Sequence, residues 1–236
     1  MKHIRPNQSK LVGDVGRHFE VSQLKIGNYK IIINYEMNLQ KTIPFLKKGL
    51  LMASKLLKIE SDMVVIASST QDEFVKDRMG GITGYTPNAY TLFLTINVKS
   101  RWKKYIIGTV AHEFNHAIRF QRIKSTRYFT LRDSLVLEGL AQCFEEDSAG
   151  TIRPWSTAIT NSQAQKTWAK LNGKLDIKSR DLYYRVFLSP DDKEFPHWAG
   201  YTIAYLILRK KLKRLKIANW NKIMNMSSEL LIEDGL

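Results

Sequence analysis

The chain has 236 residues, of which 44% are hydrophobic, and a chain of this length and composition can bury a substantial core. No stretch approaches the ~18–20 uncharged apolar residues of a membrane-spanning helix, and the basic first residues lack the apolar run of a secretory signal. The single cysteine, Cys143, excludes an internal disulfide framework and cysteine-based zinc sites. We therefore expect a soluble, cytoplasmic protein without a transmembrane segment.

The charge balance is strongly basic. The 37 Lys and Arg residues against 22 Asp and Glu residues give a formal net charge of +15, which favours an anionic partner such as nucleic acid, acidic lipid or acidic protein. Basic side chains are densest at residues 208–222, where leucines at helical spacing indicate an amphipathic helix. This helix presents either an anion-binding surface or an ordinary solvated face, and the second is the commoner outcome for a charge run.

The predicted strands lie in the first half of the chain. Residues 29–36 and 63–69 are rich in β-branched side chains, and residues 89–98 give the clearest strand pattern. Between the first two strands, residues 39–58 carry apolar side chains at helical spacing and predict a helix. A glycine-rich turn, MGGITGYTPN, leads into the third strand.

Beyond residue 100 the pattern becomes helical, with helices predicted at residues 101–123, 131–147, about 158–171 and 197–217. Strands followed by helices indicate an α+β fold. We expect a single domain over residues 1–236, with a sheet-rich part at about 20–100 and a helical part at about 101–236. The helix at the junction of the two parts carries the most informative motif.

Two of the five histidines lie four residues apart in HEFNH. In a helix, residues i and i+4 share a face, so His112 and His116 can direct both imidazoles at one zinc ion. Glu113 is rotated by about 100° from His112 and borders that point, as the general base of an H-E-x-x-H site does. The residues from 109 to 118 other than this glutamate and the histidines are uncharged, as a buried zinc helix requires. The alternative is that both histidines form hydrogen bonds in an ordinary core.

A catalytic zinc ion normally takes three protein ligands and keeps a fourth position for water. A third histidine at the compact spacing H-E-x-x-H-x-x-G-x-x-H is absent, because Arg119 and Arg122 occupy the glycine and histidine positions. The remaining candidate is Glu138, twenty-two residues after His116 in the apolar run LVLEGLA. Burying a carboxylate there is costly unless a positive group such as a metal receives it.

The surroundings of Glu138 predict an ordinary helix. Thr130 and Asp133 match a capping box at its start, and Gly139 would let a neighbouring helix approach closely. The acidic residues 145–147 near its end look like solvated surface charge.

HEFNH followed by LEGLA resembles the gluzincin metallopeptidases, whose third ligand lies in an E-x-x-A or related motif on the next helix. Residues from about 80 to 206 resemble more closely a bacterial family of uncharacterised, predicted Zn-dependent proteases, through HEFNHAIRF, LVLEGLAQCFEED, RPW and HWAGYTIAYLI. This resemblance implies a zincin-like fold with a small N-terminal mixed sheet. It also implies a Zn²⁺ ion held by His112, His116 and Glu138, with Glu113 as the catalytic base.

One position departs from that resemblance. Some gluzincins carry an aspartate four residues after the third ligand, where it supports the first histidine, and this chain has Gln142 instead. The resemblance further implies hydrolysis of a peptide bond, with a water activated by the metal and deprotonated by Glu113. The strand at 89–98 could pair with an extended substrate as an edge strand, or it could lie inside the sheet.

Gluzincins also supply an oxyanion donor from a Tyr or His late in the chain. Pro196 can open a helix at its first turn, and His197 and Tyr201 would then lie four apart on one face. Tyr201 is the first candidate for the donor, because a phenol stays protonated at neutral pH. His197 is the alternative, as that donor or as a proton shuttle, and both residues could instead pack in an aromatic core.

These observations favour a zinc metallopeptidase that acts on a peptide or protein. The alternatives are a basic protein that binds nucleic acid or an anionic surface and retains a structural or vestigial zinc site, and a zinc hydrolase with a substrate other than a peptide. The oligomeric state stays open.

Overall fold

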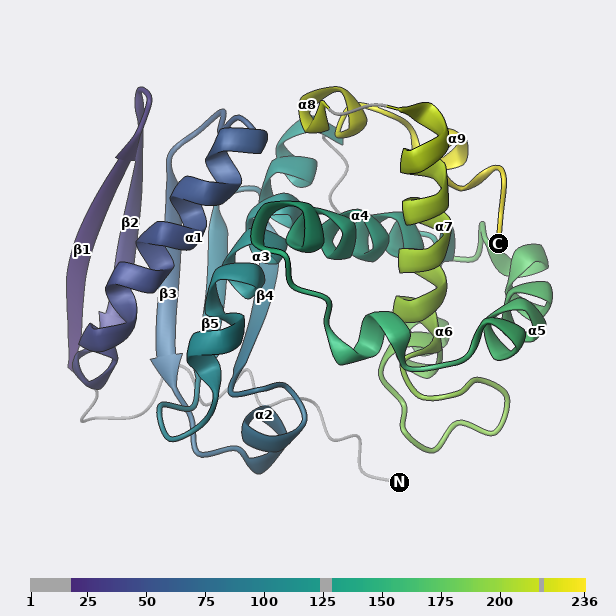
Figure 1. Ribbon diagram of the computed structural model, residues 1–236, viewed down its shortest axis with the longest axis horizontal. Helices are drawn as coiled ribbons and strands as arrows, with labels where there is room; N and C mark the ends of the chain where they lie inside the picture. Colours follow the sequence, from purple (N-terminus) through teal and green to yellow (C-terminus); the bar gives the residue numbers. More distant parts are fainter. Residues whose placement is uncertain (1–17, 124–128, 217–218) are drawn as a thin grey trace.

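The computed structural model describes residues 18–123, 129–216 and 219–236. A five-stranded sheet forms one half of the molecule and helices form the other (Figure 1), so the predicted α+β fold is confirmed. The first residues, on which the expectation of no secretory signal rests, lie outside the described part. Among the described residues, no helix is long and apolar enough to cross a membrane. The strands are β1 (Phe19–Ile26), β2 (Tyr29–Glu36), β3 (Met63–Ser69), β4 (Ile82–Asn88) and β5 (Thr91–Ile96).

The sheet is mixed, as expected. Its order is β1-β2-β3-β5-β4, in which β2, β3 and β5 run parallel while β1 and β4 pair antiparallel at the two edges. The strand expected at 89–98 therefore lies inside the sheet, as β5. Strand β1 was not predicted; it lies at an edge of the sheet, and none of its side chains is fully buried.

The edge strand β4 corrects the sequence analysis, which predicted a glycine-rich turn there. The turn is confined to Gly80 and Gly81, which adopt φ angles of 70° and 87° before the strand begins. The residues after them include Ile82, Thr83 and Tyr85, whose β-branched and aromatic side chains favour a strand. The glycines therefore precede a strand that runs along the border of the sheet.

Helices follow the predicted order with shifted ends. The 3₁₀ helix η2 and helix α1 replace the single helix expected at 39–58, and the four predicted helices beyond residue 100 correspond to α3, α4, α5 and α7. Helices α1 and α3 cover one face of the sheet side by side, while α4 and α7 form the centre of the helical half (Figure 1). The helical elements are η2 (Met37–Thr42), α1 (Ile43–Leu56), α2 (Glu73–Asp77), α3 (Trp102–Ile123), α4 (Leu131–Ala149), η3 (Pro154–Thr157), α5 (Asn161–Leu171), η4 (Asn172–Lys174), α6 (Arg180–Phe187), α7 (Ala199–Leu215), α8 (Trp220–Ile223) and α9 (Ser228–Ile232).

The start of α7 differs from the prediction. Trp198 adopts a left-handed conformation with φ of 62°, and the helix begins only at Ala199. His197 therefore precedes the helix, and its expected alignment with Tyr201 on one helical face is wrong. A bulky residue with positive φ is uncommon, so no local pattern announced this turn.

The helix that carries Glu138 forms as predicted. Thr130 and Asp133 form the reciprocal capping box at the start of α4. A Cβ atom added to Gly139 would lie 2.5 Å from the carbonyl oxygen of Ala204 and 3.0 Å from Leu208 Cδ2, both on α7. The glycine therefore allows α4 and α7 to pack closely, as its position suggested.

We expect Gly139→Ala to lower the free energy of unfolding by about 1–3 kcal/mol, because the added methyl group meets the backbone of α7. Denaturant unfolding measures the change. Gly173→Ala is the matched control, since nothing lies within 4 Å of its Cβ position, and its stability should stay the same or rise slightly. Equal losses in the two variants would contradict the close contact.

Candidate metal centre

Three buried side chains converge between α3 and α4. His112, His116 and Glu138 each offer one ligand atom, and these atoms all lie within 4.8 Å of one another. Glu138 Oε2 is 3.5 Å from His112 Nε2 and 3.7 Å from His116 Nε2. With metal–ligand bonds of about 2.0–2.2 Å, two ligands of a tetrahedral zinc ion lie about 3.4 Å apart. The spacing and the donor set therefore fit zinc.

The charges of the cluster also fit a cation. Burial alone would lower the pKa of His112, but hydrogen bonding to Glu138 and Glu145 raises it to about 10. Burial lowers the pKa of His116 to about 4. Burial would raise the pKa of Glu138, yet the nearby His116 and His112 hold it below its ordinary value. In the metal-free chain the carboxylates thus favour a positive charge at the point where the three ligand atoms meet.

Glu113 lies beside the cluster against the edge strand. Thr86 on β4 donates a hydrogen bond of 2.7 Å to Glu113 Oε2. A Cβ atom on Gly84 would lie 2.5 Å from Glu113 Oε1 and 2.6 Å from its Cδ, so a glycine is required there. Burial raises the pKa of Glu113 to about 7, although His112 and Thr86 oppose the shift. The carboxylate is therefore held in place at a basicity suited to exchanging protons near neutral pH.

The expectation that the acidic residues 145–147 are solvated is wrong for Glu145. Its side chain is buried, and its Oε2 lies 3.3 Å from His112 Nδ1, on the opposite side of the ring from Glu138. Gly108 makes room for it, because a Cβ atom there would lie 2.6 Å from Glu145 Oε1. Seven residues separate the two glutamates, which places them on the same face of α4.

Gln142, at the position where some gluzincins carry an aspartate, has another role. Its side chain donates hydrogen bonds to the carbonyl oxygens of Glu138 and Tyr201, and it accepts one of 2.6 Å from Ser156. It therefore ties α4 to α7 and η3. The carboxylate that faces the first histidine comes from Glu145 instead.

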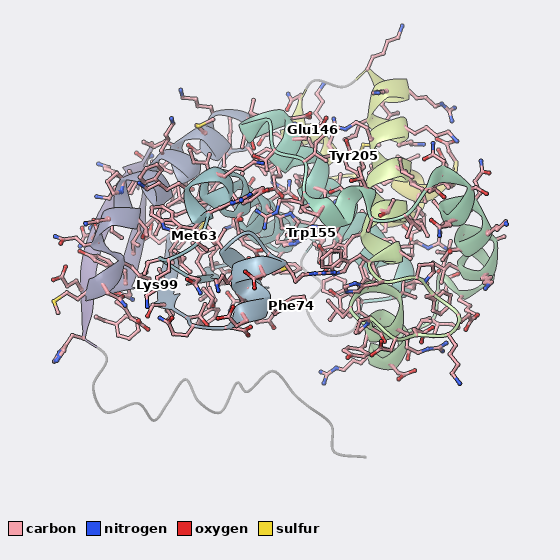
Figure 2. The ribbon with its side chains drawn as sticks, turned by 60° about the horizontal axis from the view of Figure 1, so that its bottom comes forward. Met63, Phe74, Lys99, Glu146, Trp155 and Tyr205 are labelled. Atoms are coloured by element: carbon pink, nitrogen blue, oxygen red, sulfur yellow. The ribbon has the colours of Figure 1, made fainter. Side chains whose placement is uncertain are left out.

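Arg153, in the RPW motif, joins the parts around the cluster. Its guanidinium group is buried between the rings of Tyr105 and Trp155, at 4.5 and 4.3 Å, near the middle of the molecule where Figure 2 labels Trp155. It donates to Thr109 Oγ1 on α3 and to the carbonyl oxygen of Met79, which precedes β4. Its Nη1 also lies 4.0 Å from Glu145 Oε1. One side chain thus connects α3, α4 and the segment that leads into the edge strand.

Two tyrosines meet at the cluster, Tyr201, which the sequence analysis named as the first candidate for the oxyanion donor, and Tyr183. Tyr183 on α6 forms hydrogen bonds with Glu138 and Tyr201 that contribute to their pKa shifts. Burial raises the pKa of both Tyr183 and Tyr201, so both phenols stay protonated at neutral pH. Tyr183 had no local signal, because α6 lies far from HEFNH in the sequence and only the tertiary structure brings them together.

His197 is not brought to the cluster in the same way. Its ring stacks on Trp198 with the centroids 4.2 Å apart, and the charges that act on it are those of Arg78 and Asp191. Within the described part of the chain it forms no hydrogen bond or ion pair. Of the two candidates for an oxyanion donor, only Tyr201 contacts a residue that touches Glu138.

We expect Arg153→Met to lower the free energy of unfolding by about 3–5 kcal/mol, because Glu145 would keep a buried carboxylate without its guanidinium partner. Thermal and denaturant unfolding of the metal-free protein measure the loss. Arg132→Met is the control, since Arg132 pairs with an Asp176 side chain that is 81% exposed and should contribute only about 0–1 kcal/mol. Similar losses in both variants would show that the buried pair contributes no more to the free energy of unfolding than the exposed pair does.

The chain is similar to known proteins in sequence and in fold. The protein YjfC of Bacillus subtilis (strain 168), described as uncharacterized, is 32% identical over 142 residues, which cover 53% of this chain and 44% of YjfC. The chain thus spans less than half the length of that relative. The aminopeptidase N family protein of Idiomarina loihiensis superposes with a TM-score of 0.54 at 11% identity, over 92% of this chain and 41% of that one.

An M1 zinc metallopeptidase from Deinococcus radiodurans superposes with a TM-score of 0.45 at 12% identity, over 92% of this chain and 48% of the other. At such identities the likeness to the Idiomarina protein concerns the fold alone, and the Deinococcus match is too distant to add to it. Residues 50–233 match the family described as "Predicted Zn-dependent protease (DUF2268)". The chain therefore belongs to this family of predicted Zn-dependent proteases.

Proposed function

We propose that the chain is a zinc-dependent peptidase whose metal ligands are His112, His116 and Glu138 and whose general base is Glu113. The observation that carries the proposal is the convergence of three ligand atoms within 4.8 Å of one another, with Glu138 Oε2 3.5 and 3.7 Å from the two histidine nitrogens. Membership of the family of predicted Zn-dependent proteases supports the coarse function of a zinc metallopeptidase. A zinc ion in this place would polarise the scissile carbonyl group and acidify a water molecule.

Glu113 would take the proton of the attacking water and pass it to the leaving amine. Its buried carboxylate has a pKa raised to about 7 in the metal-free chain, so it can both accept and release a proton near neutral pH. Thr86 and Gly84 on β4 fix its position, because one binds the carboxylate and the other leaves room for it. The chain thus places its base against the strand that borders the sheet.

Strand β4 would bind the substrate backbone. Among the described residues, β4 pairs with β5 only, so its second edge has no paired strand, although the carbonyl oxygen of Ile82 accepts a hydrogen bond from Arg153. A peptide in extended conformation can add to such an edge by β-augmentation. Because Glu113 contacts β4, a peptide bound there would run past the base, and we infer a peptide or protein substrate.

Tyr201 and Tyr183 would stabilise the oxyanion that forms on the scissile carbonyl. Both phenols remain protonated at neutral pH, and both interact with Glu138 or with each other beside the metal ligands. A neutral donor aimed at developing negative charge is what the oxyanion requires. Tyr201 stays the first candidate, with Tyr183 as a second donor or as the group that orients it, and His197 has less support.

The decisive experiment compares Glu113→Gln with Glu138→Gln. We expect Glu113→Gln to keep one zinc ion per chain but to cleave peptides about 10²–10⁴ times more slowly, since the amide cannot accept the water's proton. Glu138→Gln should lose zinc affinity, because it removes a charged ligand. Metal analysis and cleavage of a mixed peptide library measure both effects. Near-normal turnover of Glu113→Gln, or zinc retained at full affinity by Glu138→Gln, would contradict these roles.

A second prediction concerns the oxyanion. Tyr201→Phe should reduce turnover by about 10²–10³ while zinc stays bound, because the variant lacks only the donor hydroxyl. Turnover and metal content should be measured beside Tyr183→Phe, His197→Ala and the control Tyr184→Phe, whose side chain is exposed on α6. We expect the control and His197→Ala to cleave at the parent rate. If Tyr201→Phe does too, the donor lies elsewhere.

A further inference from the structure

The basic run at residues 208–222 contains seven Lys and Arg residues, of which three form ion pairs within the molecule. Arg209 pairs with Glu146 and Asp147, and Lys211 pairs with Glu233 and Asp234. Arg214 also pairs with Asp234, at 2.6 Å. These cations hold α7 against α4 and the C-terminal segment. Within the described residues the other four basic side chains of the run form no ion pair, so this run keeps part of its charge: Lys210, Lys213, Lys216 and Lys222.

A second group of unpaired positive charges lies on η2, α1 and the residues just after them. Residues 37–59 contain five lysines and no acidic residue. The acidic residue that follows, Glu60, is already paired with Arg122 at 3.0 Å. Within the described part of the chain, none of these lysines forms an ion pair: Lys41, Lys47, Lys48, Lys55 and Lys58.

The outward side of α1 combines these lysines with exposed apolar side chains. Lys48, Leu51 and Lys55 are exposed at the three- and four-residue spacing of one helical face, whereas Leu46, Leu50 and Ala53 on the other face are fully buried. Lys58 is exposed just after the end of the helix. Leu51 is 42% exposed and Leu56 is 36% exposed. The helix therefore presents lysines and leucines together to solvent.

The first turn of α3 extends this surface. Trp102 at the start of α3 packs edge-on against Phe45 of α1, with the ring centroids 5.3 Å apart, and the two helices lie side by side on the same face of the sheet (Figure 1). Arg101, Lys103 and Lys104 surround Trp102 and are exposed without an ion pair in the described structure. We call the lysine face the surface formed by the five lysines of residues 41–58 together with Arg101, Lys103 and Lys104.

We propose that the lysine face docks the protein on an anionic lipid surface. Anionic headgroups complement the unpaired cations, and lysine stems can keep their charged ends at the phosphates while the leucines between them enter the boundary of the acyl chains. A nucleic acid would satisfy the lysines but offers no apolar medium to Leu51 and Leu56. The inference goes beyond the proposed peptidase function and does not depend on it.

Vesicle co-sedimentation of the full chain tests this inference. We expect binding to vesicles made of phosphatidylglycerol and phosphatidylcholine in equal parts, and weak binding to vesicles of phosphatidylcholine alone. Added salt should release the protein, because it screens the attraction between the lysines and the anionic headgroups. The double variant Lys48→Gln/Lys55→Gln should bind about 25-fold more weakly, at about fivefold per lysine. Leu51→Ser should also weaken binding, which a purely electrostatic contact would not show.

The control removes the same charge from another surface. Lys210→Gln/Lys213→Gln changes two exposed lysines of α7 and should bind vesicles like the parent. Circular dichroism and melting temperature show whether each variant is folded. The proposal is overturned if the parent binds anionic and neutral vesicles equally. It is also overturned if the α7 control loses as much vesicle binding as the α1 variant. It is also overturned if RNA binds through Lys48 and Lys55 while vesicles do not.

Discussion

The arrangement of the core follows from three carboxylates buried around one imidazole. Glu113, Glu138 and Glu145 all act on His112, and each would cost several kcal/mol to bury without a compensating positive group. The chain meets this demand with the imidazoles and with Arg153, which is itself buried. Because these groups come from α3, α4 and the segment after α4, the helices cannot shift independently without separating the charges. A divalent cation among the three ligands would satisfy the same demand.

Close packing makes this concentration of charge possible, and three glycines allow the close contacts that it requires. Gly84 allows β4 to reach Glu113, Gly108 allows Glu145 to reach α3, and Gly139 allows α4 to approach α7. At each position a single methyl group would meet atoms closer than van der Waals contact permits. Small residues at three interfaces thus bring the charged groups within range of one another, and the larger side chains around them exclude water.

The features that could be predicted from the sequence are those that depend on the spacing of residues along a single helix. The pair His112 and His116 follows from helical periodicity, and Glu138 follows from an acidic residue inside an apolar run, although the roles of all three as metal ligands remain proposals. Glu145 and Tyr183 could not be found in this way, because their significance depends on tertiary contacts between distant segments. Strand β4 was missed since two glycines with positive φ precede it, and the start of α7 was misplaced because Trp198 adopts a conformation that few tryptophans do. The unpaired lysines were equally invisible, since sequence density does not report pairing.

The contact between Glu113 and β4 has a consequence for selectivity. If β4 binds a peptide as proposed, the added strand would stiffen this edge of the sheet and, through Thr86, the Glu113 carboxylate. The base would then be best ordered when an extended chain is already in place. Compact, folded proteins expose few unpaired strands, so they would leave the base loosely held. Discrimination between unfolded and folded polypeptides would then arise from the edge of the sheet rather than from recognition of a particular side chain.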